Sequence, residues 1–372
     1  MASTCNELLD ICLGGGAWSS DLLDRAIAED EGRALLSIVV ERLADLFESR
    51  LCDVYAKLFS GVIARVCPDL IPRTRRALSG ALPESAERVY VLSRITLGAD
   101  VAVTSVLLDA AKRRYPAAEI FFVGPHKNYE LFAGDARLRH FPIPYARGGT
   151  LRDRLLASAA IWIEDGIVID PDSRLTQLGL IRVCPDDQYC FFESRSFGGD
   201  GGDRLPDLAA RWAGDADARP YVNTFQPFNQ PADITVSLGV GENPSKRRDD
   251  DFERELIRIL AETGASVLVD KGGSDEERQR VERVLCPGVG HFEGPFANFA
   301  AEIARSKLFV GYDSAGGHVA SACGVPLVGI AKGFISARMA ARWRPQGTVI
   351  DGDARDVLDQ VRRALATYTF RR

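Results

Sequence analysis

The stretch from Leu308 to Ala322 carries the pattern best suited to chemistry. An apolar run leads into Asp313 and Ser314, and two glycines and an alanine-rich segment follow. A strand that turns directly into a helix has this pattern, and the free N–H groups at the helix start suit a diphosphate. We therefore predict a diphosphate site formed by Ser314, Gly316, Gly317 and His318. Asp313 would bind a hydroxyl of the ligand or orient the neighbouring groups. The alternative is a plain helix N-cap at Asp313 or Ser314, with the glycines making a tight turn.

A second candidate is Asp100, in a glycine loop that follows the β-branched and aromatic run from Arg88 to Ser93. A carboxylate at the end of a strand can act as a general base and take the proton from a hydroxyl. The alternative is an N-cap for the helix that follows. Arg94, in the same loop, either binds an anion or pairs with Asp100.

Two further loops follow predicted strands of the carboxyl-terminal half. Lys246 could neutralise a leaving phosphate, or could be a solvated lysine in a Lys-Arg-Arg run. Asp275 and Glu276 could contact a ribose or sugar hydroxyl, or could be no more than favourable charges at a helix start.

The elements that must position these residues alternate between strand and helix. Strand, loop, helix and strand between residues 87 and 124 predict a βαβ unit, which requires a parallel sheet. Segments around 161–163 and 166–170 resemble further strands. After Pro231 a second series predicts another doubly wound sheet, with strands at 234–238, 265–269, 308–311 and 327–330 and helices at 250–263, 276–285, 296–305 and 316–323.

The first 80 residues read as helices without strands. Apolar residues recur every three or four positions from Leu43 to Val62, as on one face of an amphipathic helix that ends before Pro68. The simplest interpretation is a helical cap packed on the next domain. The alternative is a module for oligomerisation or partner binding. A glycine- and proline-rich stretch at 196–232 marks a domain boundary, so we predict a helical extension (1–80) and two α/β domains (81–230 and 231–372), the last with a carboxyl-terminal helix.

Composition limits the classes of function. The 372 residues exceed what one core usually holds and suit two domains. The net charge of −6 argues against a nucleic-acid binder that depends on a general basic field. Eight scattered cysteines show neither zinc spacing nor a C-x-x-C pair, so buried thiols and no metal site are expected. We find no membrane-length apolar run and no secretory signal, and we expect a cytoplasmic protein.

Two motifs carry a family resemblance. Gly98 to Ser105, continuing to Tyr115–Ala118, resembles the amino-terminal signature of glycosyltransferase family 9, the heptosyltransferases, although Ala99 separates a glycine and an aspartate that are adjacent in the family. Gly311 to Pro326 is similar to its carboxyl-terminal signature. The resemblance spans residues 88 to about 333 and leaves the extension outside.

The resemblance implies a GT-B fold, in which two Rossmann-like domains face each other across a cleft, with the acceptor on the first and the donor on the second. It implies metal-independent, inverting transfer from a nucleotide sugar, often ADP-heptose, without a cofactor. Asp100 matches the family's catalytic base, Lys246 its phosphate-contacting lysine and Asp275 an acidic residue near the ribose. The acceptor would be a glycan, a glycolipid or a protein, with at most peripheral membrane association and no nucleic acid.

Two alternatives remain open at the level of sequence. One is a nucleotide-sugar binding protein without transferase activity, such as an assembly partner that uses its helical amino terminus. The other is a GT-B-type epimerase that acts on the nucleotide sugar itself. In either case the helices of the extension could also join copies of the chain into a homo-oligomer.

Overall fold

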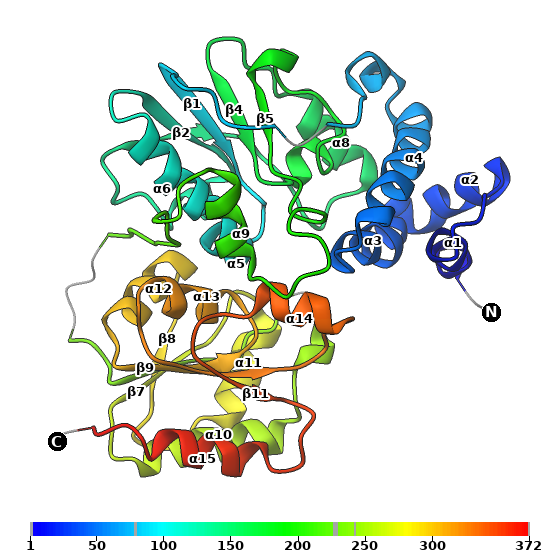
Figure 1. Cartoon of the computed structure of the whole chain (residues 1–372). Coiled ribbons are helices and arrows are strands. Elements are labelled where there is room, and N and C mark those ends of the chain that lie inside the picture. The colour runs from blue at the N-terminus through cyan, green and yellow to red at the C-terminus, as the bar shows by residue number, and fades with distance from the viewer. Residues whose placement is uncertain (1–2, 78–79, 226–229, 242, 371–372) are drawn as a thin grey trace.

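The computed structural model describes residues 3–77, 80–225, 230–241 and 243–370. It contains two parallel α/β sheets preceded by a helical extension, as predicted (Figure 1). Both termini lie at the outside of the molecule, on different domains.

The extension consists of helices that pack on the first α/β domain. Their apolar faces form one core with α8 (Leu151–Ala159) and with residues 178–181 of that domain, which is the arrangement that the cap interpretation predicts. The elements are α1 (Thr4–Leu13), α2 (Ser20–Ala28), η1 (Glu29–Gly32), η2 (Leu35–Val40), α3 (Glu41–Asp45), α4 (Ser49–Val66) and η3 (Pro68–Arg73).

The helix predicted over Leu43–Val62 is in fact two helices. Phe47 lies between α3 and α4 with a φ of 54°, a left-handed conformation that no helix continues through. The Phe47 side chain is buried, and its ring lies 6.4 Å from that of Trp343 in the second domain. Phe47 and Trp343 are nearly 300 residues apart in the chain. Apolar periodicity within residues 43–62 contains no information about this contact, so it does not reveal the break between the two helices.

The first sheet has the order β3-β2-β1-β4-β5, with every pair parallel. The strands predicted at 119–124 and 166–170 are present as β2 and β4, whereas 161–163 forms no strand. The elements are β1 (Arg88–Leu92), α5 (Leu97–Ala99), η4 (Asp100–Thr104), α6 (Ser105–Arg114), β2 (Glu119–Gly124), α7 (His126–Tyr129), β3 (Leu138–Pro142), α8 (Leu151–Ala159), β4 (Ile167–Asp170), η5 (Arg174–Thr176), η6 (Asp186–Gln188), β5 (Tyr189–Phe191) and α9 (Leu205–Trp212).

The second sheet has the order β11-β10-β9-β6-β7-β8 and is also parallel throughout. Its elements are β6 (Ile234–Ser237), η7 (Pro244–Lys246), α10 (Asp250–Glu262), β7 (Val267–Asp270), α11 (Asp275–Val284), β8 (Gly290–Phe292), α12 (Phe296–Arg305), β9 (Leu308–Tyr312), α13 (Ala315–Ala322), β10 (Leu327–Ala331), α14 (Ala337–Trp343), β11 (Thr348–Asp351) and α15 (Val357–Leu365).

The strand order places the predicted site residues where ligands bind in such sheets. The order in which the chain adds strands to the sheet reverses between β1 and β4 in the first sheet and between β6 and β9 in the second. Crevices form beyond the carboxyl ends of the strands at these points. Asp100 follows β1, Lys246 follows β6 and Asp313 follows β9.

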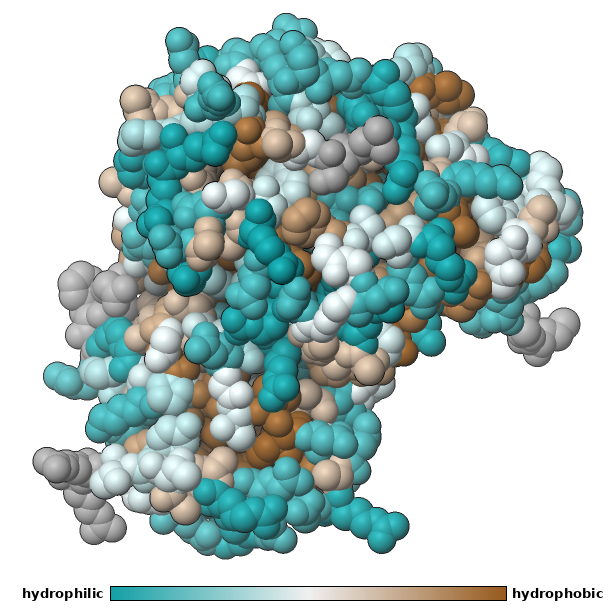
Figure 2. Space-filling view, in the orientation of Figure 1, coloured by the Kyte–Doolittle hydropathy of each residue, from teal (hydrophilic) through white to brown (hydrophobic). Residues whose placement is uncertain are grey.

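The two domains share one apolar core. Buried side chains of α6 and α9 belong to the same cluster as Phe299 and Ile303 of α12 and Val319 and Ala320 of α13. Figure 2 shows that the outer face is mainly hydrophilic, with apolar residues in small groups. The apolar contact between the domains holds their facing edges together.

The burial of the cysteines agrees with the sequence prediction for six of the eight residues. All eight lie within the described residues as free thiols, six of them buried. Among the described helices none is long and apolar enough to cross a membrane.

Candidate active site

Asp100 lies at the carboxyl end of β1 and is fully buried. Its carboxylate accepts four hydrogen bonds: Oδ1 from the Arg94 N–H (2.6 Å) and the Thr104 hydroxyl (2.7 Å), and Oδ2 from the Ser93 hydroxyl (2.7 Å) and the Asn128 amide (2.6 Å). Burial raises the pKa of Asp100, and these hydrogen bonds work in the opposite direction. The carboxylate thus joins β1, its loop, the following helix and α7.

The N-cap alternative for Asp100 is wrong. Thr96 occupies the N-cap of α5, and Asp100 has helical backbone angles at the start of the π-helical turn η4. A π turn closes an i→i+5 hydrogen bond and so takes in one residue more than an α turn. Ala99, the residue inserted relative to the family motif, precedes this turn directly. Arg94 does not pair with Asp100 through its side chain, because Nη1 donates to the Pro171 carbonyl and the Ser194 hydroxyl.

Lys246 and Asp313 form an ion pair across the second switch point. Lys246 Nζ lies 2.5 Å from Asp313 Oδ2 and 3.3 Å from the Asp313 carbonyl oxygen. Both side chains are mostly buried, so the alternative of a solvated lysine is wrong. Asp313 orients its neighbour, which is one of the two roles predicted for it, and it offsets part of the positive charge that Lys246 would offer to a phosphate.

Ser314 occupies the N-cap position of α13 but makes no side-chain cap. Its hydroxyl is buried and finds no hydrogen-bond partner among the described residues. A buried hydroxyl of this kind needs a partner, and in a ligand-free loop a ligand or water is the natural one. The capping alternative therefore fails for Ser314, and the hydroxyl stays available where the diphosphate was predicted.

Gly316 and Gly317, at the start of α13, have different reasons to be glycine. A Cβ on Gly316 would lie 2.5 Å from the ring of Phe309, whereas on Gly317 the nearest atoms, in Leu327 and Pro345, would be 3.9 Å away. Gly316 is therefore required for packing α13 on β9. Gly317 has no such constraint.

His318 lies where the two domains touch. Burial lowers the pKa of its imidazole, which favours the neutral ring, and both Asp313 and Lys246 act on it electrostatically. A Cβ on Gly98 would come within 3.0 Å of His318 Cδ2. The loop before Asp100 therefore rests directly on the loop of Asp313, Ser314 and His318.

Asp275 does not join this group. Its side chain is 87% exposed and pairs with Arg278 on the same helix, while Ser274 and Glu277 form a capping box at the helix start. Of the two interpretations of Asp275, the structure thus agrees with the second, a favourable negative charge at the start of a helix. The group that the fold does bring together consists of the Asp100 loop with Lys246, Asp313, Ser314, Gly316, Gly317 and His318.

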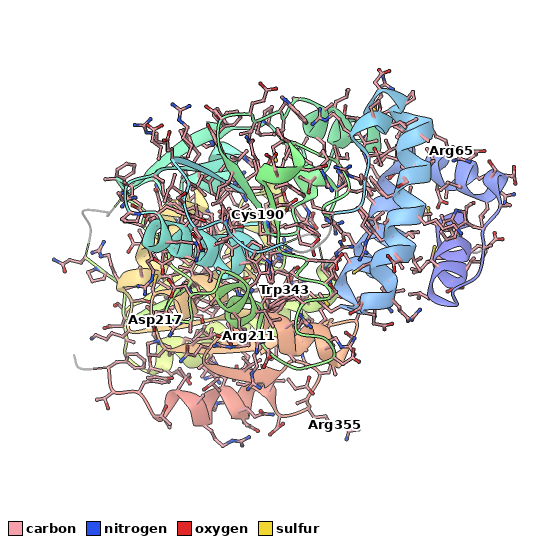
Figure 3. All side chains as sticks on the ribbon, turned by 45° about the horizontal axis from the view of Figure 1, so that its top comes forward. Arg65, Cys190, Arg211, Asp217, Trp343 and Arg355 are labelled. Atoms are coloured by element: carbon pink, nitrogen blue, oxygen red, sulfur yellow. The ribbon has the colours of Figure 1, made fainter. Side chains whose placement is uncertain are left out.

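Sequence analysis missed Trp343, which ends α14 between the domains (Figure 3). The Trp343 ring lies 5.9 Å from the ring of His318. The guanidinium of Arg94, from the first domain, lies 5.7 Å from the centre of the same Trp343 ring. In the sequence, the one feature that could have indicated Trp343 was its position at the end of the alanine-rich segment 337–343. Within the described part of the chain, no group of three or more His, Cys, Asp or Glu residues could hold a metal ion.

Comparison with known proteins agrees with this arrangement. Residues 189–333 match the family model "Glycosyltransferase family 9 (heptosyltransferase)". The match includes Lys246 and the segment from Asp313 to His318 but does not reach Asp100. No curated protein is similar enough in sequence to match the chain.

Solved structures of heptosyltransferases have the same fold. E. coli heptosyltransferase WaaC with ADP matches with a TM-score of 0.56 at 16% identity, covering 75% of this chain and 99% of that one. E. coli ADP-heptose LPS heptosyltransferase II matches with a TM-score of 0.53 at 16% identity, covering 75% and 98%. The family match and the shared GT-B fold together confirm the predicted resemblance: residues 189–333 are similar to glycosyltransferase family 9, and the chain has the fold of the solved heptosyltransferases.

Proposed function

We propose that the protein transfers a sugar, heptose or a related one, from a nucleoside diphosphate to a hydroxyl of a glycan, glycolipid or protein, with inversion and without a metal ion. The observation that carries this proposal is the unpartnered, buried Ser314 hydroxyl at the start of α13, with Lys246 and His318 beside it. A helix start, a hydroxyl and a cation are the groups that stabilise a leaving diphosphate.

In this reaction the acceptor oxygen bonds to the anomeric carbon as the bond from that carbon to the diphosphate oxygen breaks. Inversion requires the two oxygens to lie on opposite faces of the sugar. The proposed donor loop and the Asp100 loop lie on opposite domains and touch at Gly98 and His318, which supports such an arrangement. ADP-heptose is our first choice of donor, because a WaaC structure of this fold contains ADP-2-deoxy-2-fluoro heptose.

Asp100 is our candidate for the general base, and its surroundings set the condition for that role. A base must come within about 3 Å of the proton it takes, yet both Asp100 oxygens are occupied. Oδ2 accepts from Ser93 and from Asn128, so movement of α7 away from η4 would remove one of its two donors and make room for an acceptor hydroxyl. Burial raises the pKa of Asp100, and a higher pKa makes its carboxylate a stronger base.

Thermal shift with ADP, UDP and GDP tests the donor site, because a ligand of the folded state stabilises it by RT ln(1 + [L]/Kd). We expect stabilisation by one of them, reduced in Lys246→Met. Absence of any shift would contradict the donor site. Release of nucleoside diphosphate only when an acceptor is present distinguishes a transferase from a binding protein and from an epimerase.

The role of Asp100 needs a separate experiment. Asp100→Asn should lower turnover by roughly 10² to 10⁴ and remove the acidic limb of the pH–rate profile. Thr104→Val deletes one donor but keeps the carboxylate, so it should cost stability and leave that limb in place. Wild-type turnover in Asp100→Asn would exclude the base role.

A further inference from the structure

The backbone and the side chain of Phe47 make opposite demands. Phe47 lies between α3 and α4 with a φ of 54°, in the left-handed region that glycine adopts most easily. A turn alone would therefore be served better by glycine. Non-glycine residues keep such a conformation only where their surroundings fix it, and they gather at functional sites. The Phe47 side chain is buried, so the reason for a phenylalanine lies in what its ring contacts.

The ring of Phe47 does not pack in the core of the extension. Its neighbours Leu43, Ala44 and Leu51 belong to that core, whereas Phe47 belongs to the apolar cluster that the two α/β domains share. The break between α3 and α4 thus turns one apolar side chain out of the extension. The extension packs on the first domain through its helices and contacts the second domain through Phe47.

Three side chains of α14 receive Phe47. The Trp343 ring lies 6.4 Å from the Phe47 ring in an edge-to-face arrangement, with an interplanar angle of 69°. The guanidinium of Arg342 lies 5.3 Å from the centre of the Phe47 ring. Arg338 Nη1 donates a hydrogen bond to the Phe47 carbonyl oxygen (2.9 Å). The backbone and the ring of Phe47 therefore both hold α14 in place.

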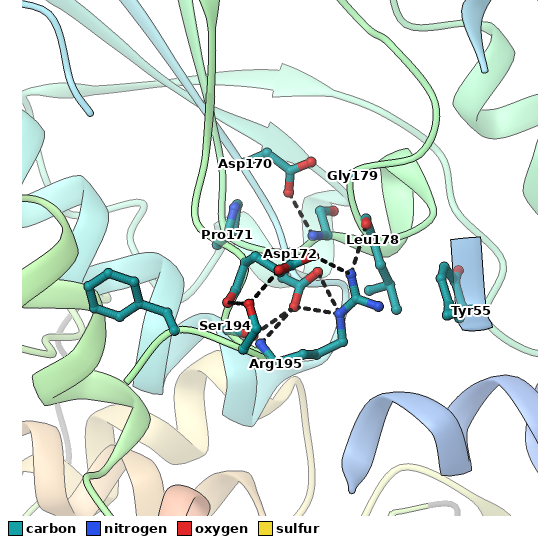
Figure 4. A network of polar contacts seen from close by, with 12 residues as sticks. Tyr55, Asp170, Pro171, Asp172, Leu178, Gly179, Ser194 and Arg195 are labelled. Carbon is teal, nitrogen blue, oxygen red and sulfur yellow. Dashed lines mark hydrogen bonds and ion pairs between the residues drawn. The ribbon is translucent and has the colours of Figure 1, made fainter. Parts of the chain in front are cut away.

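The first domain holds the same helix through the loop after β5. Arg342 Nη1 donates to the Ser194 carbonyl oxygen (3.1 Å). The Ser194 hydroxyl donates to Asp172 (2.9 Å), which also accepts from Arg195 Nε (3.0 and 3.1 Å) (Figure 4). The Arg195 guanidinium lies 5.1 Å from the centre of the Tyr55 ring in α4. This buried network fixes Ser194 relative to the extension, so α14 docks on a rigid surface.

Trp343 connects Phe47 with both parts of the candidate active site. Its ring lies 5.9 Å from the His318 ring at an interplanar angle of 68°. On the first domain, the Arg94 guanidinium lies 5.7 Å from the centre of the Trp343 ring, and the Arg94 N–H donates to Asp100 (2.6 Å). Aromatic pairs prefer particular relative orientations. A displacement of Trp343 would therefore change the orientation of the His318 imidazole.

We propose that Phe47 is a positioning residue for the donor side of the reaction. It fixes Trp343, and Trp343 sets the orientation of the His318 imidazole, so the helical extension controls the shape of the diphosphate site. The part of this proposal that concerns the diphosphate rests on the proposed function. The positioning of His318 by Phe47 does not, and it can be measured in the ligand-free protein.

NMR of the histidine side chains in the full, ligand-free chain tests the proposal. The chain has four histidines, and His318→Gln identifies the signal of His318. The Trp343 ring is close enough for its ring current to shift this signal, and burial lowers the pKa of His318. Phe47→Gly keeps the left-handed turn and removes the ring. In this variant we expect the His318 signal to move and its pKa to rise toward the ordinary value, because a loosened ring is better hydrated.

A second variant and a matched control accompany Phe47→Gly. Phe47→Leu keeps a buried apolar side chain and the strained backbone but has no ring, and it should move the His318 signal as well. Glu31→Gly is the control, because Glu31 is an exposed residue of the extension with nearly the same φ, 52°, and pairs with Arg33 at the surface. This control relieves the same backbone strain and should leave the His318 signal as it is in the wild type.

The affinity for ADP, measured by calorimetry, gives the functional result. Loss of one aromatic pair changes the population of a correctly oriented state by roughly two- to tenfold. The dissociation constant of ADP should increase by this factor in both Phe47 variants and stay unchanged in Glu31→Gly. A role of Phe47 in stability alone would leave both the affinity and the His318 signal of the folded protein unaltered.

An unchanged His318 signal in folded Phe47→Gly or Phe47→Leu protein would overturn the proposal. A moved signal together with wild-type affinity for ADP would overturn the control of the diphosphate site by the extension. If ADP, UDP and GDP all fail to bind the wild-type protein, the donor site of the proposed function is refuted. The His318 signal then still decides whether Phe47 acts through Trp343.

Discussion

Arg342 of α14 joins the second domain to the first, and its substitution tests how strongly. The side chain is fully buried. Nη1 donates to the carbonyl oxygens of Ser194 (3.1 Å) and Phe197 (2.9 Å), and Nη2 to that of Gly199 (2.7 Å). The guanidinium also lies 5.3 Å from the Phe47 ring. One side chain thus binds the glycine loop of the first domain and the break between α3 and α4.

The expected cost of Arg342→Ala follows from these contacts. Each hydrogen bond from a charged donor contributes about 1.5 to 3 kcal/mol, and the substitution leaves the buried carbonyls without that donor. Part of the loss is offset, because burial of the cation is itself unfavourable and lowers the pKa of Arg342. We therefore expect a net loss of about 3 to 5 kcal/mol in the free energy of unfolding.

Urea unfolding followed by tryptophan fluorescence measures this loss, and small-angle scattering measures whether the domains separate. Arg344→Ala is the matched control, since Arg344 is exposed one residue beyond the same helix. A loss below about 1 kcal/mol would refute the reasoning, since it would mean that the three carbonyl contacts contribute almost nothing.

Three further predictions concern the second domain and the first sheet. Gly316→Ala should destabilise by about 1 to 3 kcal/mol, because its Cβ would meet Phe309 at 2.5 Å, whereas Gly317→Ala should be neutral or stabilising; equal melting temperatures would contradict the packing argument. Burial raises the pKa of Asp170 from 3.8 to about 6, so its contribution to stability should fall by about 2 kcal/mol as pH rises from 4 to 6. The free energy of unfolding of Asp170→Asn should lack this decrease between pH 4 and pH 6. The same pH dependence in the variant and the wild type would contradict the role of Asp170. Asp275→Ala should leave the ADP thermal shift unaltered, since that carboxylate points into solvent; a reduced shift would place it at the nucleotide.

The buried elements could be predicted closely from sequence, and the edge elements could not. Strand β2 and helix α12 have the predicted bounds, because continuous apolar runs and regular periodicity mark them. The edge strands β3, β5, β8 and β11 were all missed. Strands β3, β8 and β11 are short and mostly not buried, and β5 has only three residues. No apolar pattern distinguishes them from a loop, and only pairing with a neighbouring strand defines them.

The site shows the same division. Topology alone predicts that the loops after β1, β6 and β9 gather at facing sheet edges, and they do. Pairing of Lys246 with Asp313 joins residues 67 positions apart, and the donors to Asp100 are spread from Ser93 to Asn128. Whether a charged side chain faces a ligand, a partner or solvent depends on such contacts, which spacing along the chain does not contain.

The contact between α14 and the break at Phe47 has a consequence for the way the protein is made. Arg338 donates to the Phe47 carbonyl from 291 positions later in the chain, and Trp343 covers the Phe47 ring. At a synthesis rate of roughly 5 to 20 residues per second, the partners of Phe47 emerge about 15 to 60 seconds after it does. During that time the first domain must wait with an apolar surface uncovered, which makes the nascent chain a natural client for chaperones.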